Sequence, residues 1–267
     1  MKSNAGPKMF KRLKSMLPLR ASKQFLNLEG FEGTVYVIGD VHGRLDLLLG
    51  LEAVIFDDAK GTDTETLIVY IGDMIDRGPD SAGVLAHICG PAPTGVLRLA
   101  LLGNHEQMLL RFAHDTNEDL WLDFGGRETL MSYGVGERET FDVKPGTTDM
   151  RLLLHKVIPR EHLNFLQALP IAITLKHFIL THAGGNPAKA FAEQTKREMV
   201  WGSKGFMKAK ANYGREMVHG HYIVDEVQRA DGKISIDTGA YDSGRLSAVK
   251  LEHSGGVKFL QFEILKN

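Results

Sequence analysis

Three short polar motifs, each placed directly after an apolar run, constrain the fold of this chain more than any other feature. The apolar runs are Thr34–Ile38, Leu67–Ile71 and Val96–Leu102, and a helix-type pattern follows each motif. Alternation of strands and helices in this way predicts βαβ units and a largely parallel sheet. Because the carboxyl ends of parallel strands lie at one edge of a sheet, we expect the three motifs to meet there.

The three motifs carry side chains that bind divalent metal ions. They read Gly39-Asp40-Val41-His42-Gly43, Gly72-Asp73-Met74-Ile75-Asp76-Arg77-Gly78 and Gly103-Asn104-His105-Glu106. Carboxylate, amide and imidazole groups at one point suit Mn²⁺, Fe or Zn²⁺, and one carboxylate placed between two ions can bridge them. From the order of the motifs in the chain, Asp73 is the best candidate for the bridge.

Two later segments add imidazole groups after strand-like runs. His182 follows His177–Thr181, and a His-Gly-His sequence follows a shorter apolar run. Glycines beside these residues let the backbone turn sharply and approach a ligand closely. The candidate metal ligands are therefore Asp40, His42, Asp73, Asn104, His182 and His221.

Three further side chains in the motifs indicate catalytic chemistry. Arg77 can bind phosphate oxygens through its planar guanidinium group. His105 is the natural general acid for a leaving alkoxide, and Asp76 can fix its tautomer by accepting a hydrogen bond from its other ring nitrogen. Two ions roughly 3.5–4 Å apart can clamp a phosphoryl group and lower the pKa of a shared water. The pattern predicts hydrolysis of phosphomonoesters by direct attack of a metal-bridging hydroxide.

In order and spacing, these motifs resemble those of the phosphoprotein phosphatases, the serine/threonine branch of the calcineurin-like metallophosphoesterases. The segment Ile236–Ala240 resembles a tail motif of bacterial and bacteriophage members, so the resemblance spans residues 34–251. It implies manganese or iron as the metal, Arg77 and Asn104 as substrate-binding residues, and His221 in preference to His219 as the final ligand. The implied ligand sets are Asp40, His42 and Asp73 for one ion, and Asp73, Asn104, His182 and His221 for the other.

Two positions depart from the pattern of that family. Leu102 stands where many members have an arginine, and a further phosphate-contacting arginine is expected near Trp201. The cations nearest to Trp201 in the sequence are Lys196, Arg197 and Lys204. Up to two phosphate-binding arginines are therefore missing or replaced, which affects substrate preference more than the metal site. Trp121 and Trp201 themselves are expected to be packing residues.

We predict an α/β fold, a two-sheet β-sandwich flanked by helices in four layers, as in the calcineurin-like metallophosphoesterases. A single domain is expected over residues 31–267, with a helical cap around residues 115–170. The expected helices of the cap are Glu118–Phe124, Glu128–Tyr133, Met150–Val157 and Arg160–Leu169. In the second half we expect a helix at Ala188–Glu198, an antiparallel pair at Ile171–Leu175 and His177–Thr181, and strands at Met217–His219, Lys233–Ile236, Leu246–Leu251 and Val257–Phe262.

Charge and cysteine content exclude several classes of protein. The 32 Lys and Arg residues are balanced by 33 Asp and Glu, so no bulk basic field attracts nucleic acid. The single cysteine, Cys89, excludes an internal disulfide and a cysteine-ligated zinc cluster, and it fits a reducing cytoplasm.

Residues 1–30 are expected to form a basic leader. Lys2 to Lys23 include seven Lys or Arg and no acid, with apolar residues at helical spacing. Such a segment can make weak contact with an anionic membrane surface, and the alternative is a solvated leader packed loosely on the domain.

Three functions remain open at this point. The leading one is a two-metal phosphatase acting on phosphoserine or phosphothreonine in proteins. Whether it prefers these residues to phosphotyrosine is open. The second is a diadenosine-tetraphosphate or other nucleotide hydrolase on the same scaffold, since a fold does not decide a substrate. The intact Asp76-Arg77-Gly78 sequence favours the phosphatase, because the symmetric dinucleotide hydrolases tend to alter that Asp. The third is a catalytically silent binding module, against which the complete ligand set argues.

Overall fold

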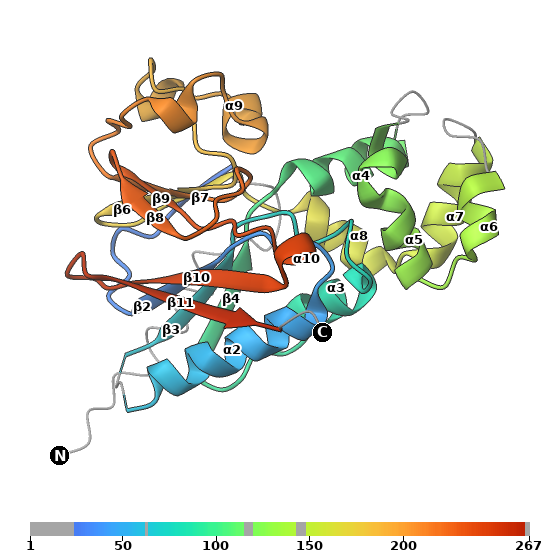
Figure 1. Ribbon diagram of the computed structural model, residues 1–267, viewed down its shortest axis with the longest axis horizontal. Coiled ribbons are helices and arrows are strands. Elements are labelled where there is room, and N and C mark those ends of the chain that lie inside the picture. Colours follow the sequence, from blue (N-terminus) through green and yellow to red (C-terminus); the bar gives the residue numbers. More distant parts are fainter. Residues whose placement is uncertain (1–23, 62–63, 115–119, 143–147, 265–267) are drawn as a thin grey trace.

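The computed structural model describes residues 24–61, 64–114, 120–142 and 148–264, which form two sheets with helices on both outer faces (Figure 1). The five-stranded sheet has the order β11-β10-β2-β3-β4. Its centre is the predicted parallel array of β2 (Thr34–Ile38), β3 (Thr66–Tyr70) and β4 (Val96–Ala100). The antiparallel strands β10 (Arg245–Leu251) and β11 (Val257–Glu263) extend it beyond β2.

The second sheet has six strands in the order β1-β5-β6-β7-β9-β8. The strands are β1 (Phe25–Asn27), β5 (Ala172–Thr174), β6 (Phe178–Thr181), β7 (Glu216–His219), β8 (Gln228–Ala230) and β9 (Lys233–Ser235). Strands β5 and β6 form the predicted antiparallel pair, whereas β6, β7 and β9 run parallel to one another. The carboxyl ends of β6 and β7 therefore lie at one edge, as do those of β2, β3 and β4 in the other sheet.

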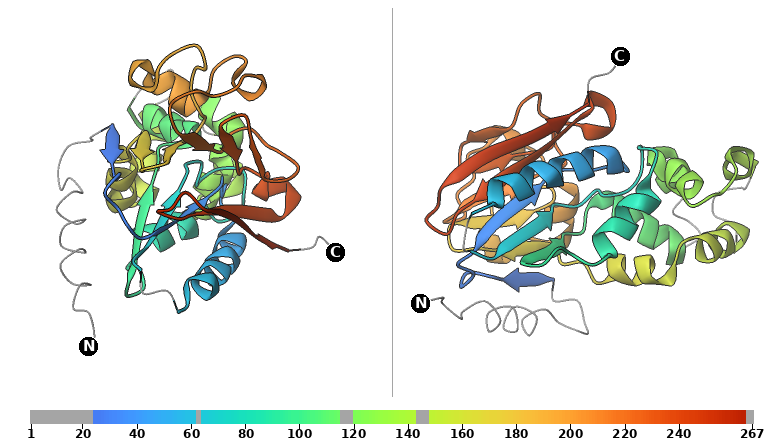
Figure 2. Two further views of the ribbon diagram at one scale, coloured as in Figure 1. Left: turned by 90° about the vertical axis from the view of Figure 1, so that its left-hand side faces the viewer. Right: turned by 90° about the horizontal axis from the view of Figure 1, so that it is seen from below.

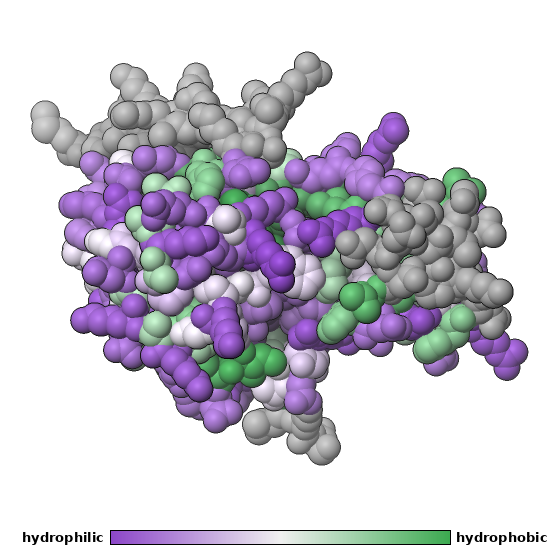
Figure 3. All heavy atoms as spheres, turned by 90° about the horizontal axis from the view of Figure 1, so that it is seen from above, coloured by the Kyte–Doolittle hydropathy of each residue, from purple (hydrophilic) through white to green (hydrophobic). Residues whose placement is uncertain are grey.

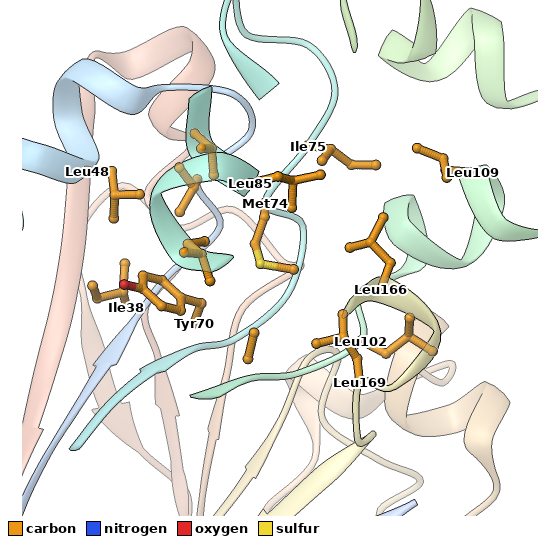
Figure 4. Packing of buried hydrophobic residues seen from close by; sticks show 14 of the residues in the cluster. Ile38, Leu48, Tyr70, Met74, Ile75, Leu85, Leu102, Leu109, Leu166 and Leu169 are labelled. Atoms are coloured by element: carbon orange, nitrogen blue, oxygen red, sulfur yellow. The ribbon is translucent and has the colours of Figure 1, made fainter. Parts of the chain in front are cut away.

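Both faces of the central strands β2 and β3 are buried, which explains their almost continuous apolar sequences. In β2, Val35 and Val37 belong to the core between the two sheets, whereas Tyr36 and Ile38 belong to the core under the helices. Figure 4 shows the latter core, in which Ile38 and Tyr70 of the sheet lie near Leu48 and Leu85 of the helices. This alternation follows from the two-residue period of a strand and fixes its register.

The helices complete four layers. On the outer face of the five-stranded sheet lie α2 (Leu45–Ala59) and α3 (Ser81–Cys89), and on the outer face of the six-stranded sheet lie α9 (Lys196–Trp201) and the 3₁₀ turns Phe191–Glu193 and Phe206–Lys208 (Figures 1 and 2). The expected four-layer sandwich is confirmed. No helix among the described residues is long and apolar enough to cross a bilayer.

The described residues of the region 120–170 are mostly helical and extend to one side of the sandwich (Figure 2). The region includes the π-helical segment Leu122–Gly126, α5 (Arg127–Ser132), α6 (Glu137–Asp142), α7 (Thr148–Val157) and α8 (Arg160–Gln167). Helix α4 (Asn104–His114) follows β4 and connects the five-stranded sheet to this helical region. A further short helix, α10 (Ala240–Ser243), lies before β10.

Three details differ from the sequence prediction. The strand β1 lies inside the range 1–30 assigned to the leader, and it pairs in parallel with β5, so this part of the range belongs to the sheet. The helix expected at Ala188–Glu198 is wrong in position: α9 begins at Lys196, because Thr195 and Glu198 form a capping box there. Strand β8, which is exposed and polar, and α6 were not predicted. The proposed membrane contact concerns residues 1–23, which lie outside the described residues.

Candidate metal centre

The first two motifs lie in the loops that follow β2 and β3, and the third runs from the loop after β4 into the first turn of α4. Backbone hydrogen bonds tie the first two loops together, since the N–H groups of Val41 and His42 both donate to the carbonyl of Asp73, over 3.1 and 2.9 Å. His42 and Asp73 have positive φ angles of 45° and 50°. Non-glycine residues in this region are strained, and such strain persists where the surrounding structure fixes it. The folded structure therefore holds His42 and Asp73 in backbone conformations that are unfavourable for an isolated chain.

The second sheet supplies the remaining imidazoles. His182 follows β6 directly, and Gly220 and His221 follow β7. The N–H of His221 donates to Oδ2 of Asp40 over 3.0 Å, which connects the last motif with the first. A Cβ at Gly220 would lie 1.9 Å from Oδ1 of Asp40, so only glycine allows this close approach.

Hydrogen bonds fix the tautomers of two imidazoles. His42 donates from Nδ1 to the carbonyl of Ile75 (2.9 Å), and His182 donates from Nδ1 to the carbonyl of Ile71 (3.1 Å). In the neutral form of each ring, Nε2 then carries a lone pair that can bind a metal ion. Burial lowers the pKa of His42 to about 3, so this ring is neutral at physiological pH.

Two groups of ligand atoms share Asp73. His42, Asp73 and His105 form one group, and Asp73, His182 and His221 form the other; within each group the ligand atoms lie within 4.8 Å of one another. Oδ2 of Asp73 is 3.7 Å from Nε2 of His42, whereas Oδ1 is 3.3 Å from Nε2 of His182. The two oxygens of one carboxylate therefore face different groups, so two ions could share Asp73.

Asn104 and Asp40 contact the histidines of the second group of ligand atoms. The side-chain oxygen of Asn104 is 2.9 Å from Nε2 of His182 and 2.9 Å from Nδ1 of His221. Burial alone would lower the pKa of His182, but the neighbouring Asp73 raises it above its usual value, so a proton or a metal ion is favoured at the Nε2 that faces this oxygen and Asp73. Oδ1 of Asp40 is buried and has no hydrogen-bond partner among the described residues. The donor set fits divalent metal ions on these grounds.

Buried acids surround the same space. Burial, with the nearby carboxylates of Asp237 and Asp73, raises the pKa of Asp40 well above its usual range. Burial and Asp73 raise the pKa of Glu106 to about 7, and burial raises that of Asp237 to about 6. Carboxylates gathered in a low-dielectric space repel one another, and nearby positive charge removes that cost.

His105 and Asp76 form the predicted pair. Nδ1 of His105 donates to Oδ2 of Asp76 over 2.8 Å, and Nε2 is buried without a hydrogen-bond partner among the described residues. Burial alone would lower the pKa of His105, but Asp73 and Asp76 together raise it above its usual value. The pair therefore favours a protonated imidazole whose Nε2–H has no acceptor among the described residues.

Arg77 lies beside the same groups and is partly exposed. Its guanidinium group donates to Nε2 of His42 over 3.2 Å and lies 4.8 Å from the ring centre of Tyr241. Its backbone N–H faces the carbonyl of Gly125 in the cap, where a Cβ would lie 2.4 Å from that nitrogen. The cap thus helps to place the arginine.

His219, the alternative to His221, has a different environment. Its two ring nitrogens lie 2.9 Å from the carbonyl of Gly220 and 2.9 Å from Oγ of Ser235, and it belongs to neither group of ligand atoms. Both ring nitrogens of His219 therefore have partners in the protein, whereas His221 belongs to one of the two groups of ligand atoms.

Four residues near the site were missed by sequence reasoning. Glu106 accepts hydrogen bonds from the backbone N–H groups of Gly103, Asp73 and Met74, which ties two motifs together. Its place in the third motif was the available signal. Asp237 lies in the tail motif Ile236–Ala240 and Tyr241 follows it directly, but the sequence assigned no role to this motif. Trp121 was expected only to pack, whereas its Nε1–H donates to Asp76 over 2.9 Å.

We expect Trp121→Phe to lower the free energy of unfolding by about 1.5–3 kcal/mol, because it removes a hydrogen bond to a buried charged group while keeping an aromatic ring beside Phe112. Urea denaturation measures the change. Trp201→Phe is the matched control, since the indole of Trp201 donates to the neutral Gln107 and its loss should cost less. Equal stability of wild type and Trp121→Phe would show that the hydrogen bond to Asp76 contributes nothing.

Two sheets that deliver carboxylate, amide and imidazole groups to one point define a metal-dependent phosphoesterase. The model of the calcineurin-like phosphoesterase family matches residues 33–225, and the chain belongs to this family.

Curated relatives carry two kinds of name. Serine/threonine-protein phosphatase 2 of Escherichia coli is 28% identical over 82% of this chain and 93% of its own length. A symmetrical bis(5′-nucleosyl)-tetraphosphatase of Ralstonia nicotianae is 30% identical over 57% of this chain and 42% of its own length.

A solved structure shares the fold. A protein serine/threonine phosphatase from Saccharomyces cerevisiae superposes with a TM-score of 0.57 over 97% of this chain and 89% of its own, at 14% identity. At such low identity the likeness extends to the fold alone.

Proposed function

We propose that this protein hydrolyses phosphomonoesters in a reaction that depends on two divalent metal ions, and that its substrates are phosphoserine and phosphothreonine in proteins. The observation that carries the proposal is the pairing of His105 with Asp76 beside the shared carboxylate Asp73. This arrangement supplies a proton donor next to a site for two cations, which is what cleavage of an alkyl phosphate requires. Support for a protein substrate comes from the serine/threonine-protein phosphatase 2 of Escherichia coli, of which 93% aligns with this chain.

The residues have separate roles in this proposal. When bound, two divalent ions would polarise the phosphoryl group and lower the pKa of water. One would be held by Asp40, His42 and Asp73, and the other by Asp73, Asn104, His182 and His221. Manganese is the first ion to test, with iron or zinc as alternatives.

The protein itself binds and protonates the substrate. Arg77 and the Asn104 amide bind phosphate oxygens, which orients phosphorus for in-line attack. His105 donates the Nε2 proton to the leaving oxygen of the serine or threonine, and Asp76 holds the ring in the correct orientation. The cytoplasmic location expected from the single cysteine stays a prediction.

A nucleotide hydrolase is the second candidate, because tetraphosphatases also occur among the relatives, one of them aligned over 80% of this chain at 26% identity. A turnover panel in Mn²⁺ separates the two. It compares a phosphoserine peptide, a phosphotyrosine peptide, diadenosine tetraphosphate and a phosphodiester. We expect the highest kcat/KM for the phosphoserine peptide. Preference for diadenosine tetraphosphate would replace the proposal by the second candidate, and no turnover of any substrate would indicate a silent binding module.

We expect EDTA to lower the melting temperature of the purified protein by roughly 5–10 °C, because ions that bind only the folded state stabilise it. Without them, the carboxylates of Asp237, Asp73 and Glu106 repel the buried carboxylate of Asp40 with no metal charge between them. Thermal denaturation followed by circular dichroism measures the shift, and EDTA already saturated with Mn²⁺ is the control. The same melting curve with both forms of EDTA would contradict a preformed metal site.

A further inference from the structure

A cavity of about 480 Å³ lies between α4 and α9. Its walls are formed by Gln107, Arg111, Lys196, Arg197 and Trp201, and we refer to it as the α4–α9 pocket. Both helices lie on the same side of the molecule (Figure 1), and this side, seen from above in Figure 3, is largely hydrophilic. None of these residues has a role in the proposed reaction.

The pocket adjoins the candidate metal centre through both of its walls. Helix α4 begins at Asn104. Gln107 and Arg111 follow three and seven residues later and therefore lie on the same face of the helix as Asn104. With a rise of 1.5 Å per residue, Arg111 lies about 10 Å along the helix axis from Asn104. On the other wall, Trp201 donates to Gln107 over 2.6 Å, and Met199 accepts a hydrogen bond from the backbone of Ala183, next to His182.

Positive charge dominates the walls of the pocket. Arg111, Lys196 and Arg197 are all exposed, and no ion pair between described residues involves Lys196 or Arg197. The nearest acid in α9, Glu198, is occupied by Lys189, Asn186 and its own capping box. Burial and the neighbouring Arg111 lower the pKa of Lys196, so two cations repel one another here. An anion between them would remove that repulsion.

We propose that the α4–α9 pocket binds an acidic side chain of a phosphopeptide substrate, located about three residues from the phosphorylated residue. The inference rests on the proposed protein phosphatase activity. An extended peptide advances about 3.3 Å per residue, so three residues cover about 10 Å, the length of α4 from Asn104 in the candidate metal centre to Arg111 in the pocket. Lys196 and Arg197 then set sequence preference, a task distinct from that of Arg77, which binds the phosphate to be removed. Glutamate, aspartate and a second phosphate share the chemistry that the pocket recognises.

The test uses the full chain in Mn²⁺ and phosphoserine peptides that differ only at the third residue on either side of the phosphoserine. We expect kcat/KM to decrease in the order Glu, Gln, Lys at one of these positions. The kcat/KM of the Glu peptide should be about five- to tenfold higher than that of the Gln peptide, which is the effect expected of two exposed charge pairs. Added salt should reduce this difference, because exposed charges are screened.

The double variant Lys196→Gln/Arg197→Gln should lose the preference for the Glu peptide. It should keep the wild-type kcat/KM for the Gln peptide and for p-nitrophenyl phosphate. Both side chains lie in the first turn of α9, where positive charge opposes the helix dipole, so their neutralisation should not destabilise the fold. Lys208→Gln/Lys210→Gln removes two exposed charges outside the pocket and is the matched control.

Three results would overturn the inference in different ways. Equal kcat/KM for the Glu, Gln and Lys peptides in the wild type would remove the acidic subsite while leaving the phosphatase proposal intact. A preference for Glu that survives in the double variant would place recognition elsewhere. Turnover of diadenosine tetraphosphate but of no peptide, lost in the double variant, would overturn the proposed function and assign the pocket to a polyphosphate.

Discussion

His105→Ala is expected to lower kcat for a phosphoserine peptide by about 10²–10⁴-fold, the usual contribution of a general acid. The loss for p-nitrophenyl phosphate should be smaller, because p-nitrophenolate leaves readily without a proton whereas a serine alkoxide does not. The structural basis is the hydrogen bond of 2.8 Å between His105 and Asp76 and the buried Nε2 that has no other partner among the described residues. Steady-state kinetics with both substrates in Mn²⁺ measure the two effects.

The comparison of substrates distinguishes proton donation from a structural role. His177→Ala, which changes an exposed histidine outside both groups of ligand atoms, is the control and should retain full activity. Equal losses for both substrates would indicate that His105 supports the metal site, to which it also lies close at 3.8 Å from Asp73. Full turnover of the phosphoserine peptide by His105→Ala would remove this residue from the mechanism.

Asp73→Asn should have an effect of similar or larger size on every substrate. The carboxylate of Asp73 faces both groups of ligand atoms, so its loss weakens two cation sites at once. A metal ion contributes several kcal/mol to stabilisation of the transition state, and each 1.36 kcal/mol is tenfold in rate. We therefore expect kcat/KM to fall by about 10³-fold or more for the phosphoserine peptide and for p-nitrophenyl phosphate alike.

A second readout keeps this prediction independent of activity. The melting temperature of Asp73→Asn should respond less to Mn²⁺ than that of the wild type, because bound ions no longer share a bridging ligand. Asp225→Asn, which neutralises an exposed carboxylate outside both groups, should behave like the wild type in both assays. An unchanged response to Mn²⁺ together with unchanged turnover would mean that Asp73 is not a shared ligand.

The parts of the fold that could be predicted are those in which local pattern and tertiary burial agree. Strands β2 and β3 are buried on both faces and β4 is partly buried, and each therefore reads as a short, mainly apolar run ended by a glycine-containing motif. Strand β8 has no buried residue, and β1 has only one, so neither carries a hydrophobic signal. The start of α9 was misplaced because its cap depends on a side-chain contact between Thr195 and Glu198 rather than on periodicity.

The candidate site divides in the same way. The residues predicted for it lie in motifs, where each glycine and each polar ligand is a local signal. Trp121, Asp237 and Tyr241 reach the site from distant segments, and their interactions with Asp76, Asp40 and Arg77 depend on how the sheets and the cap pack together. A buried tryptophan reads as a packing residue in a sequence, because nothing local shows the acceptor that its N–H will find.

The central claim is that Asp73 lies between two cations. Anomalous diffraction from crystals grown with Mn²⁺ tests it most directly, since it locates each ion without reference to activity. The proposed site predicts two peaks roughly 3.5–4 Å apart, one on each side of the Asp73 carboxylate. A single peak, or peaks that leave Asp73 without a metal contact, would contradict it.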